Sequence, residues 1–171
     1  LAGLDVTRHD GTLVPAREWR TGKTMDLLRI LALNNGRPVR KSRLIETLWP
    51  GVSEDRARGS LRTASSHIRQ ATRINCIARH PEGLVLTGAW VDTVEFLEVV
   101  RDAHKSARDG NHEQVLRFAR AAEELYVGDL HAYDDESEWA KAEREHLRRA
   151  RYGLLCDAAA AALELGAFAE A

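Results

Sequence analysis

Apolar residues recur at helical spacing in three successive segments of the first half of the chain. A broad apolar face runs from Met25 to Leu33, and a shorter one covers residues 42–49. Pro50 and Gly51 end the second helix, because proline cannot continue a helix and glycine permits the turn. The third segment, about 54–73, carries a stripe of apolar and small residues at helical spacing: Leu61, Ala64, Ser65, Ile68, Ala71 and Thr72. The pattern therefore predicts three helices, with a tight break between the last two.

Short alternating segments lie on both sides of these helices. Residues 4–14 have the pattern of two short strands around Asp10 and Gly11, a pair that favours a hairpin turn. After the third helix, residues 75–87 alternate weakly around a turn at 79–83, which predicts a β-hairpin with a basic tip. Short strands, three helices and a terminal hairpin are typical of a winged helix-turn-helix module.

From Asp92 onward the pattern is helical throughout. Helices are predicted over about 92–108, 111–125 and 138–165, and a further helix begins at Ala167. Successive helical hairpins with small residues at their contacts indicate a helical-repeat domain. Only about one and a half hairpins are present, fewer than a free-standing array needs. This domain is therefore expected to be truncated at its C-terminus.

The predicted fold class is thus mainly α. A winged helix-turn-helix DNA-binding domain with small β-sheets is expected over residues 1–90. A helical domain that resembles tetratricopeptide repeats is expected over residues 91–171.

Charge divides the chain at the same place. The 171 residues have a net charge of -1, but residues 1–92 hold 15 basic and 9 acidic side chains, a net of +6. Residues 93–171 hold 10 basic and 17 acidic side chains, a net of -7. Such a split indicates a nucleic-acid-facing part joined to an acidic part with another task. No secretory signal or run of about 18 apolar residues is visible, so a cytoplasmic protein without membrane contact is expected.

One face of the predicted helix at 54–73 combines the groups that contact DNA. It carries guanidinium, hydroxyl, imidazole and amide groups and has no acid after Asp55. Such groups read base edges and bind phosphates in a major groove. The predicted base contacts are Arg62, Thr63, Ser66, His67 and Gln70. The predicted phosphate contacts, which include the hairpin, are Arg58, Ser60, Arg69, Arg73, Arg79 and His80.

Other chemistry finds little support in the sequence, and neither an enzyme nor a cofactor is expected. The segment Gly22-Lys23-Thr24 has the end of a phosphate-binding loop but lacks a glycine at position 17. Ser66 and His67 are neighbours on a helix and do not face each other, which disfavours nucleophilic catalysis. No second ligand pair accompanies Cys76 and His80, so no metal site is expected. Cys76 and Cys156 are both expected to be buried free thiols.

Several segments together resemble a known family of regulators. The chain is similar to transcriptional activators of the Streptomyces antibiotic regulatory protein type, which join an OmpR/PhoB-like DNA-binding domain to a bacterial transcriptional activator domain. The resemblance rests on residues 43–49, 57–71, 91–96, 125–130, 138–140 and 162–166. One departure is the hairpin segment Gly83-Leu84-Val85-Leu86, where family members commonly carry an aromatic and a basic residue.

The resemblance implies partners as well as a fold. It implies head-to-tail dimers on direct repeats of double-stranded DNA. It also implies that RNA polymerase holoenzyme is contacted by the loop between the last two helices of the DNA-binding domain, here Pro50, Gly51, Val52, Ser53, Glu54 and Asp55.

Two functions of different classes remain open from the sequence. The leading interpretation is a sequence-specific, double-stranded-DNA-binding transcriptional activator that recruits RNA polymerase. The alternative is a helical-repeat signalling scaffold whose basic domain docks a protein partner.

Overall fold

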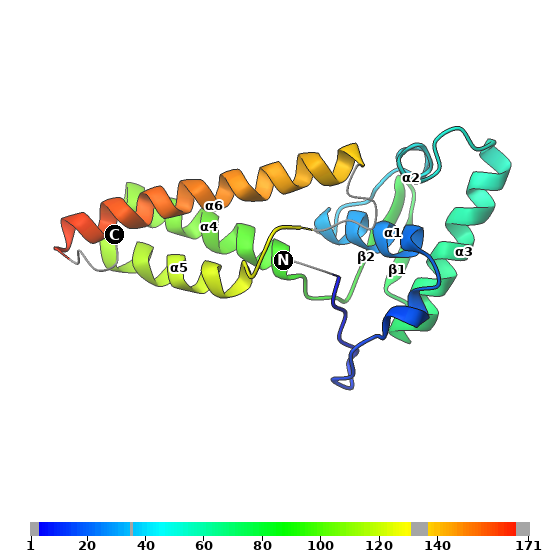
Figure 1. Ribbon diagram of the computed structural model, residues 1–171, viewed down its shortest axis with the longest axis horizontal. Helices are drawn as coiled ribbons and strands as arrows, with labels where there is room; N and C mark the ends of the chain where they lie inside the picture. Colours follow the sequence, from blue (N-terminus) through cyan, green and yellow to red (C-terminus); the bar gives the residue numbers. More distant parts are fainter. Residues whose placement is uncertain (1–3, 35, 131–136, 167–171) are drawn as a thin grey trace. The chain divides into compact units, whose positions relative to one another are not determined.

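A computed structural model describes residues 4–34, 36–130 and 137–166 (Figure 1). The predicted start of a helix at Ala167 lies outside these residues. The described part is mainly helical, as the sequence predicts, and has one two-stranded antiparallel sheet where small sheets were predicted. It divides into an N-terminal unit, residues 4–91, and a helical unit, residues 92–130 and 138–166.

The N-terminal unit contains a short 3-10 helix, three α-helices and a hairpin (Figure 1). These elements are η1 (Ala16–Trp19), α1 (Gly22–Leu33), α2 (Lys41–Leu48), α3 (Glu54–Thr72), β1 (Ile77–His80) and β2 (Gly83–Leu86). The Thr21 side chain accepts a hydrogen bond from the Thr24 backbone N–H at 3.2 Å and so caps α1. α3 begins at Glu54, as predicted, so Glu54 and Asp55 of the predicted polymerase-contact loop form its first turn.

The core of the N-terminal unit is formed by the apolar stripes of the three α-helices. Its fully buried side chains come from η1, each α-helix and β1: Trp19, Leu27, Leu31, Leu44, Leu48, Ile68 and Ile77. α3 contacts η1, α1 and α2, so its inner face lies against most of the unit. Burial of this stripe leaves the opposite face of α3 to solvent.

The hairpin is joined to the segment between α1 and α2. β1 and β2 pair in register from Ile77 with Leu86 to His80 with Gly83, so the turn is shorter than the predicted 79–83. Val39 forms an isolated antiparallel bridge with Leu84, with N–H···O distances of 2.8 and 3.0 Å. A Cβ atom at Gly83 would lie 1.9 Å from the Val39 carbonyl oxygen. Only glycine leaves room for this close approach, which sequence spacing does not reveal.

The N-terminal segment has the predicted turn but not the two predicted strands. Thr7 and Leu13 form an isolated bridge, and Gly11 has φ +80° in the turn between them. The backbone N–H of Val14 also donates to the Val6 carbonyl at 2.8 Å. Polar side chains of this segment bond to η1 and α3, so it is held by those helices rather than by a longer strand ladder.

The helical unit is built from α4 (Asp92–Arg108), α5 (His112–Leu125) and α6 (Glu138–Glu164), each of which contacts the other two (Figure 1). Phe96, Leu147 and Leu154 are 0% exposed. Small buried residues on all three helices permit close packing: Ala103, Ala119, Ala122, Ala158 and Ala162. The observed helices agree closely with the predicted ranges.

Polar contacts join the end of α5 to α6. The Tyr126 hydroxyl donates to Asp129 at 2.7 Å, and Arg148 binds the same carboxylate through two nitrogens at 3.0 and 2.5 Å. The Arg148 and Tyr126 hydrogen bonds lower the pKa of Asp129 to about 2, whereas burial and the bond to Asp129 raise the pKa of Tyr126 to about 12. Arg151 makes a two-nitrogen contact with Glu123 and lies 4.7 Å from the centre of the Tyr126 ring. These contacts set the position of α6 against α5.

Candidate nucleic-acid interface

The outer face of α3 presents the residues predicted to contact bases. The side chains of Arg62, Thr63, Ser66 and Gln70 are exposed, and His67 is half-buried. The opposite stripe is buried and includes two residues with hydroxyl groups. Both hydroxyls hydrogen-bond to backbone carbonyls of α3: Ser65 donates to Leu61 and Thr72 donates to Ile68, each at 2.8 Å. The division of α3 into two faces is therefore as predicted, while contact with DNA stays a prediction.

The predicted phosphate contacts on α3 differ in how much of each side chain is free. Arg58 is exposed and forms an ion pair with Glu54 at 2.5 Å. The Ser60 hydroxyl donates to the backbone carbonyl of the preceding turn at 3.1 Å. Arg69 is half-buried and donates to the Ile77 carbonyl of β1 at 2.8 Å. This bond commits part of the Arg69 guanidinium to joining α3 and the hairpin.

The remaining three predicted phosphate contacts are exposed. Arg73 is the C-cap of α3 and has φ +61°, a left-handed conformation. Arg79 and His80 lie at the end of β1 rather than in the turn. His80 Nδ1 accepts from the Glu82 backbone N–H at 3.2 Å, so the neutral ring carries its proton on Nε2 and can donate to a phosphate oxygen.

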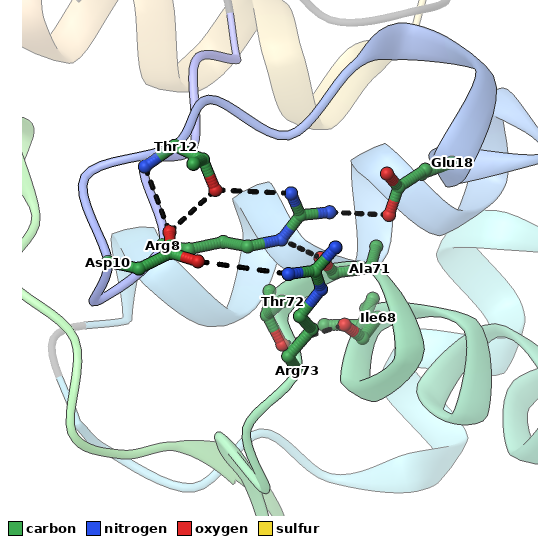
Figure 2. A network of polar contacts seen from close by, with 8 residues as sticks. All are labelled: Arg8, Asp10, Thr12, Glu18, Ile68, Ala71, Thr72 and Arg73. Atoms are coloured by element: carbon green, nitrogen blue, oxygen red, sulfur yellow. Dashed lines mark hydrogen bonds and ion pairs between the residues drawn. The ribbon is translucent and has the colours of Figure 1, made fainter.

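Arg8 fixes the C-terminal end of α3, a role that the sequence did not reveal (Figure 2). It is 9% exposed, and its Nε donates to the Ala71 carbonyl in the last turn of α3 at 2.8 Å. Its Nη2 lies 2.5 Å from Glu18 in η1. A cation that bonds a terminal carbonyl also interacts favourably with the helix dipole. The contact partners lie far apart in sequence, and no local pattern around Arg8 signals them.

A basic cluster that is not among the predicted contacts lies at the start of α2. Arg40, Lys41 and Arg43 are exposed. The bridge between Val39 and Leu84 brings the Arg40 backbone beside Gly83, so the start of α2 lies next to the hairpin. The run of cations was visible in the sequence, but its proximity to the hairpin was not.

The described residues add little support for other kinds of site. No described group of three or more His, Cys, Asp or Glu side chains is placed to hold a metal ion. Cys76 is buried as predicted, but Cys156 is exposed, because it lies on the outer face of α6. In the described parts of the chain, no helix is long and apolar enough to cross a membrane.

One comparison with known proteins matches the helical unit, and another matches most of the chain. Residues 91–171 match the model of the bacterial transcriptional activator domain family. The chain is similar to the structure of Mycobacterium tuberculosis EmbR in complex with a low-affinity phosphopeptide, with 26% identity and a TM-score of 0.77. That match covers 92% of this chain and 43% of the EmbR chain, so this chain spans less than half of EmbR. No curated protein matches significantly. The family match therefore describes the helical unit, and the structural match shows a protein of similar fold.

Proposed function

We propose that this chain is a sequence-specific, double-stranded-DNA-binding transcriptional activator whose N-terminal unit is a winged helix-turn-helix. The observation that carries the proposal is the outer face of α3, where Arg62, Ser66 and Gln70 are exposed opposite a fully packed stripe. A helix of 19 residues is about 28 Å long, and the major groove, about 12 Å wide, admits an α-helix. Residues 91–171 are proposed as the regulatory domain.

The arrangement of cations around α3 supports the same placement. The basic cluster of α2 lies near the hairpin through the bridge from Val39 to Leu84, and Arg69 joins α3 to β1. A groove-bound helix has phosphates on both sides, so cations on neighbouring elements can fix its orientation. We therefore add Arg40, Lys41 and Arg43 to the proposed phosphate contacts.

Replacing Arg62 by alanine is expected to weaken operator binding by about 1–3 kcal/mol and relax the preference at one base position, as for loss of one bidentate base contact. The measurement is a mobility-shift titration on an operator selected from a pool of random duplexes. Arg101→Ala is the matched control, because Arg101 is an exposed arginine of α4 and its loss changes the net charge equally. Unchanged affinity and unchanged base preference for Arg62→Ala would show that α3 is wrongly placed.

We propose further that the segment from Pro50 to Asp55 contacts RNA polymerase holoenzyme. All six residues of this segment are exposed, and its two acids, Glu54 and Asp55, lie together at the start of α3. Exposed acids beside a DNA-binding face are available to a protein partner, whereas phosphates repel them.

Changing Glu54 and Asp55 to lysine is expected to reduce activated transcription in a reconstituted assay and to leave DNA affinity nearly unchanged. Because Glu54 pairs with Arg58, a proposed phosphate contact, Asp55→Lys alone is the necessary companion variant. It reverses one charge without releasing Arg58. Parallel loss of transcription and DNA affinity in Asp55→Lys would point to a DNA-binding or folding defect and argue against a polymerase contact.

Head-to-tail dimers on direct repeats are the proposed form of assembly on DNA. The hairpin segment from Gly83 to Leu86 lacks the aromatic and basic side chains common in the family, so a single N-terminal unit has fewer contacts with DNA than a unit that carries them. Two protomers that bind side by side make twice as many contacts, and binding of the first raises the effective concentration of the second. Titration on duplexes with one and with two half-sites measures this cooperativity.

A protein partner for the helical unit is compatible with this function. Tyr152 and Leu163 of α6 are 72% and 59% exposed. If the N-terminal unit bound no DNA in the mobility-shift assay, this apolar surface would favour the alternative function, a signalling scaffold.

A further inference from the structure

A carboxylate is held in a fixed position at the C-terminal end of α3 (Figure 2). Asp10 Oδ1 accepts hydrogen bonds from the Thr12 backbone N–H at 2.9 Å and the Thr12 hydroxyl at 2.6 Å. This is the local turn that aspartate side chains favour. Thr12 is itself bonded by Arg8, at 3.3 Å, and Arg8 is bonded to the Ala71 carbonyl of α3. The turn is thus attached to the end of the helix.

The second oxygen of Asp10 faces Arg73. Asp10 Oδ2 lies 3.7 Å from Arg73 Nη1, and the two side chains are 53% and 64% exposed. Both groups are therefore accessible to solvent and to a ligand. An exposed ion pair of this kind is weak, so a phosphate can replace the carboxylate.

We propose that Asp10 limits the sequence-independent affinity for DNA by competing with phosphate for Arg73. This inference rests on the proposed function, in which Arg73 is a phosphate contact at the end of α3. Contacts between cations and phosphates supply nearly all non-specific affinity. An acid fixed beside one of those cations lowers that affinity in two ways: it occupies the guanidinium, and it repels the phosphate that would approach.

The geometry favours competition over assistance. An acid that assisted binding would hold one nitrogen of the guanidinium in a short hydrogen bond. The other nitrogens would then point toward the DNA phosphate. Here the contact is a single exposed one at 3.7 Å, too long to fix the orientation of Arg73. The charge of Asp10, in contrast, acts on an approaching phosphate at any orientation.

The test compares Asp10→Asn with Asp5→Asn in the full chain. Asp5 is an exposed acid of the same segment, so both variants raise the net charge by one. Asparagine keeps an oxygen for Thr12, and Asp10→Ser is a second variant that keeps a hydroxyl oxygen there. The probe is a random-sequence DNA duplex titrated at several salt concentrations, with thermal unfolding of each variant measured in parallel.

Asp10→Asn is expected to tighten binding to this duplex about two- to fivefold beyond the effect of Asp5→Asn, as for loss of a competing exposed ion pair. The slope of log affinity against log salt should steepen by about 0.9, the value for one additional phosphate contact. In an Arg73→Ala background the Asp10→Asn change should give no further gain beyond that of Asp5→Asn. Asp10→Ser should behave as Asp10→Asn does.

Three results would overturn the inference. Equal effects of Asp10→Asn and Asp5→Asn would leave only long-range charge. A gain that persists in the Arg73→Ala background would remove Arg73 from the explanation. In both cases binding by the unchanged chain would leave the proposed function intact, whereas absence of any duplex binding by that chain would overturn both.

Discussion

Replacing Gly83 by alanine is expected to destabilise the N-terminal unit by roughly 3 kcal/mol, the upper end of the cost of inserting a group into a packed site. The added Cβ would lie 1.9 Å from the Val39 carbonyl oxygen and 2.5 Å from its carbonyl carbon. These are backbone atoms, so no side-chain rotation relieves the contact. The bridge between Val39 and Leu84 must separate, and the hairpin then loses its pairing with the segment between α1 and α2. Urea denaturation measures the free energy of unfolding.

Gly59→Ala is the matched control for this change. Gly59 lies inside α3, and a Cβ atom there would meet nothing within 4 Å. Alanine in a helix interior is favoured over glycine by about 0.8–1 kcal/mol, so this variant should be more stable than the unchanged chain. If Gly83→Ala were as stable as Gly59→Ala, the hairpin would not depend on the close approach to Val39.

Replacing Phe96 by alanine is expected to destabilise the helical unit by about 3–5 kcal/mol, the range for deleting a buried aromatic ring. Phe96 is 0% exposed, and its ring centre lies 5.2 Å from that of Tyr126. Its removal leaves a cavity beside the residue that bonds Asp129 and contacts Arg151. Urea denaturation gives the total loss, and amide hydrogen exchange assigns it to residues of the helical unit.

Tyr152→Ala supplies the corresponding control. It removes an aromatic ring from the same unit at a position that is 72% exposed. Surface substitutions usually change stability by less than about 0.5 kcal/mol. Comparable losses in Phe96→Ala and Tyr152→Ala would mean that Phe96 is not part of the core.

The helices could be predicted because their signals are local. The stripe from Leu61 to Thr72 repeats at helical spacing. Pro50 and Gly51 end α2 through their own backbone preferences, without any contact from elsewhere in the protein. The two faces of α3 follow from the same period, so the exposure of Arg62, Ser66 and Gln70 could be anticipated. A period places residues on a face without knowledge of what packs against it.

The strands and loop ends were predicted less well, because distant backbone atoms decide them. Gly83 permits the close approach of Val39, which belongs to a segment far away in sequence. The segment at residues 4–14 is held by Arg8 contacts to Ala71 and Glu18 and forms a single bridge. Weak alternation over a few residues carries no information about such partners.

The sequence alone determined the order and type of the helices, the change in charge between the two halves, and the set of side chains on the outer face of α3. Each of these depends on residue type and spacing along one segment. Only the tertiary structure decided that Arg8 bonds the last turn of α3, that Asp10 faces Arg73, and that the start of α2 lies near the hairpin. Those relations depend on hydrogen bonds and an ion pair between segments far apart in the chain, which form only when the apolar faces of η1 and the helices have packed together.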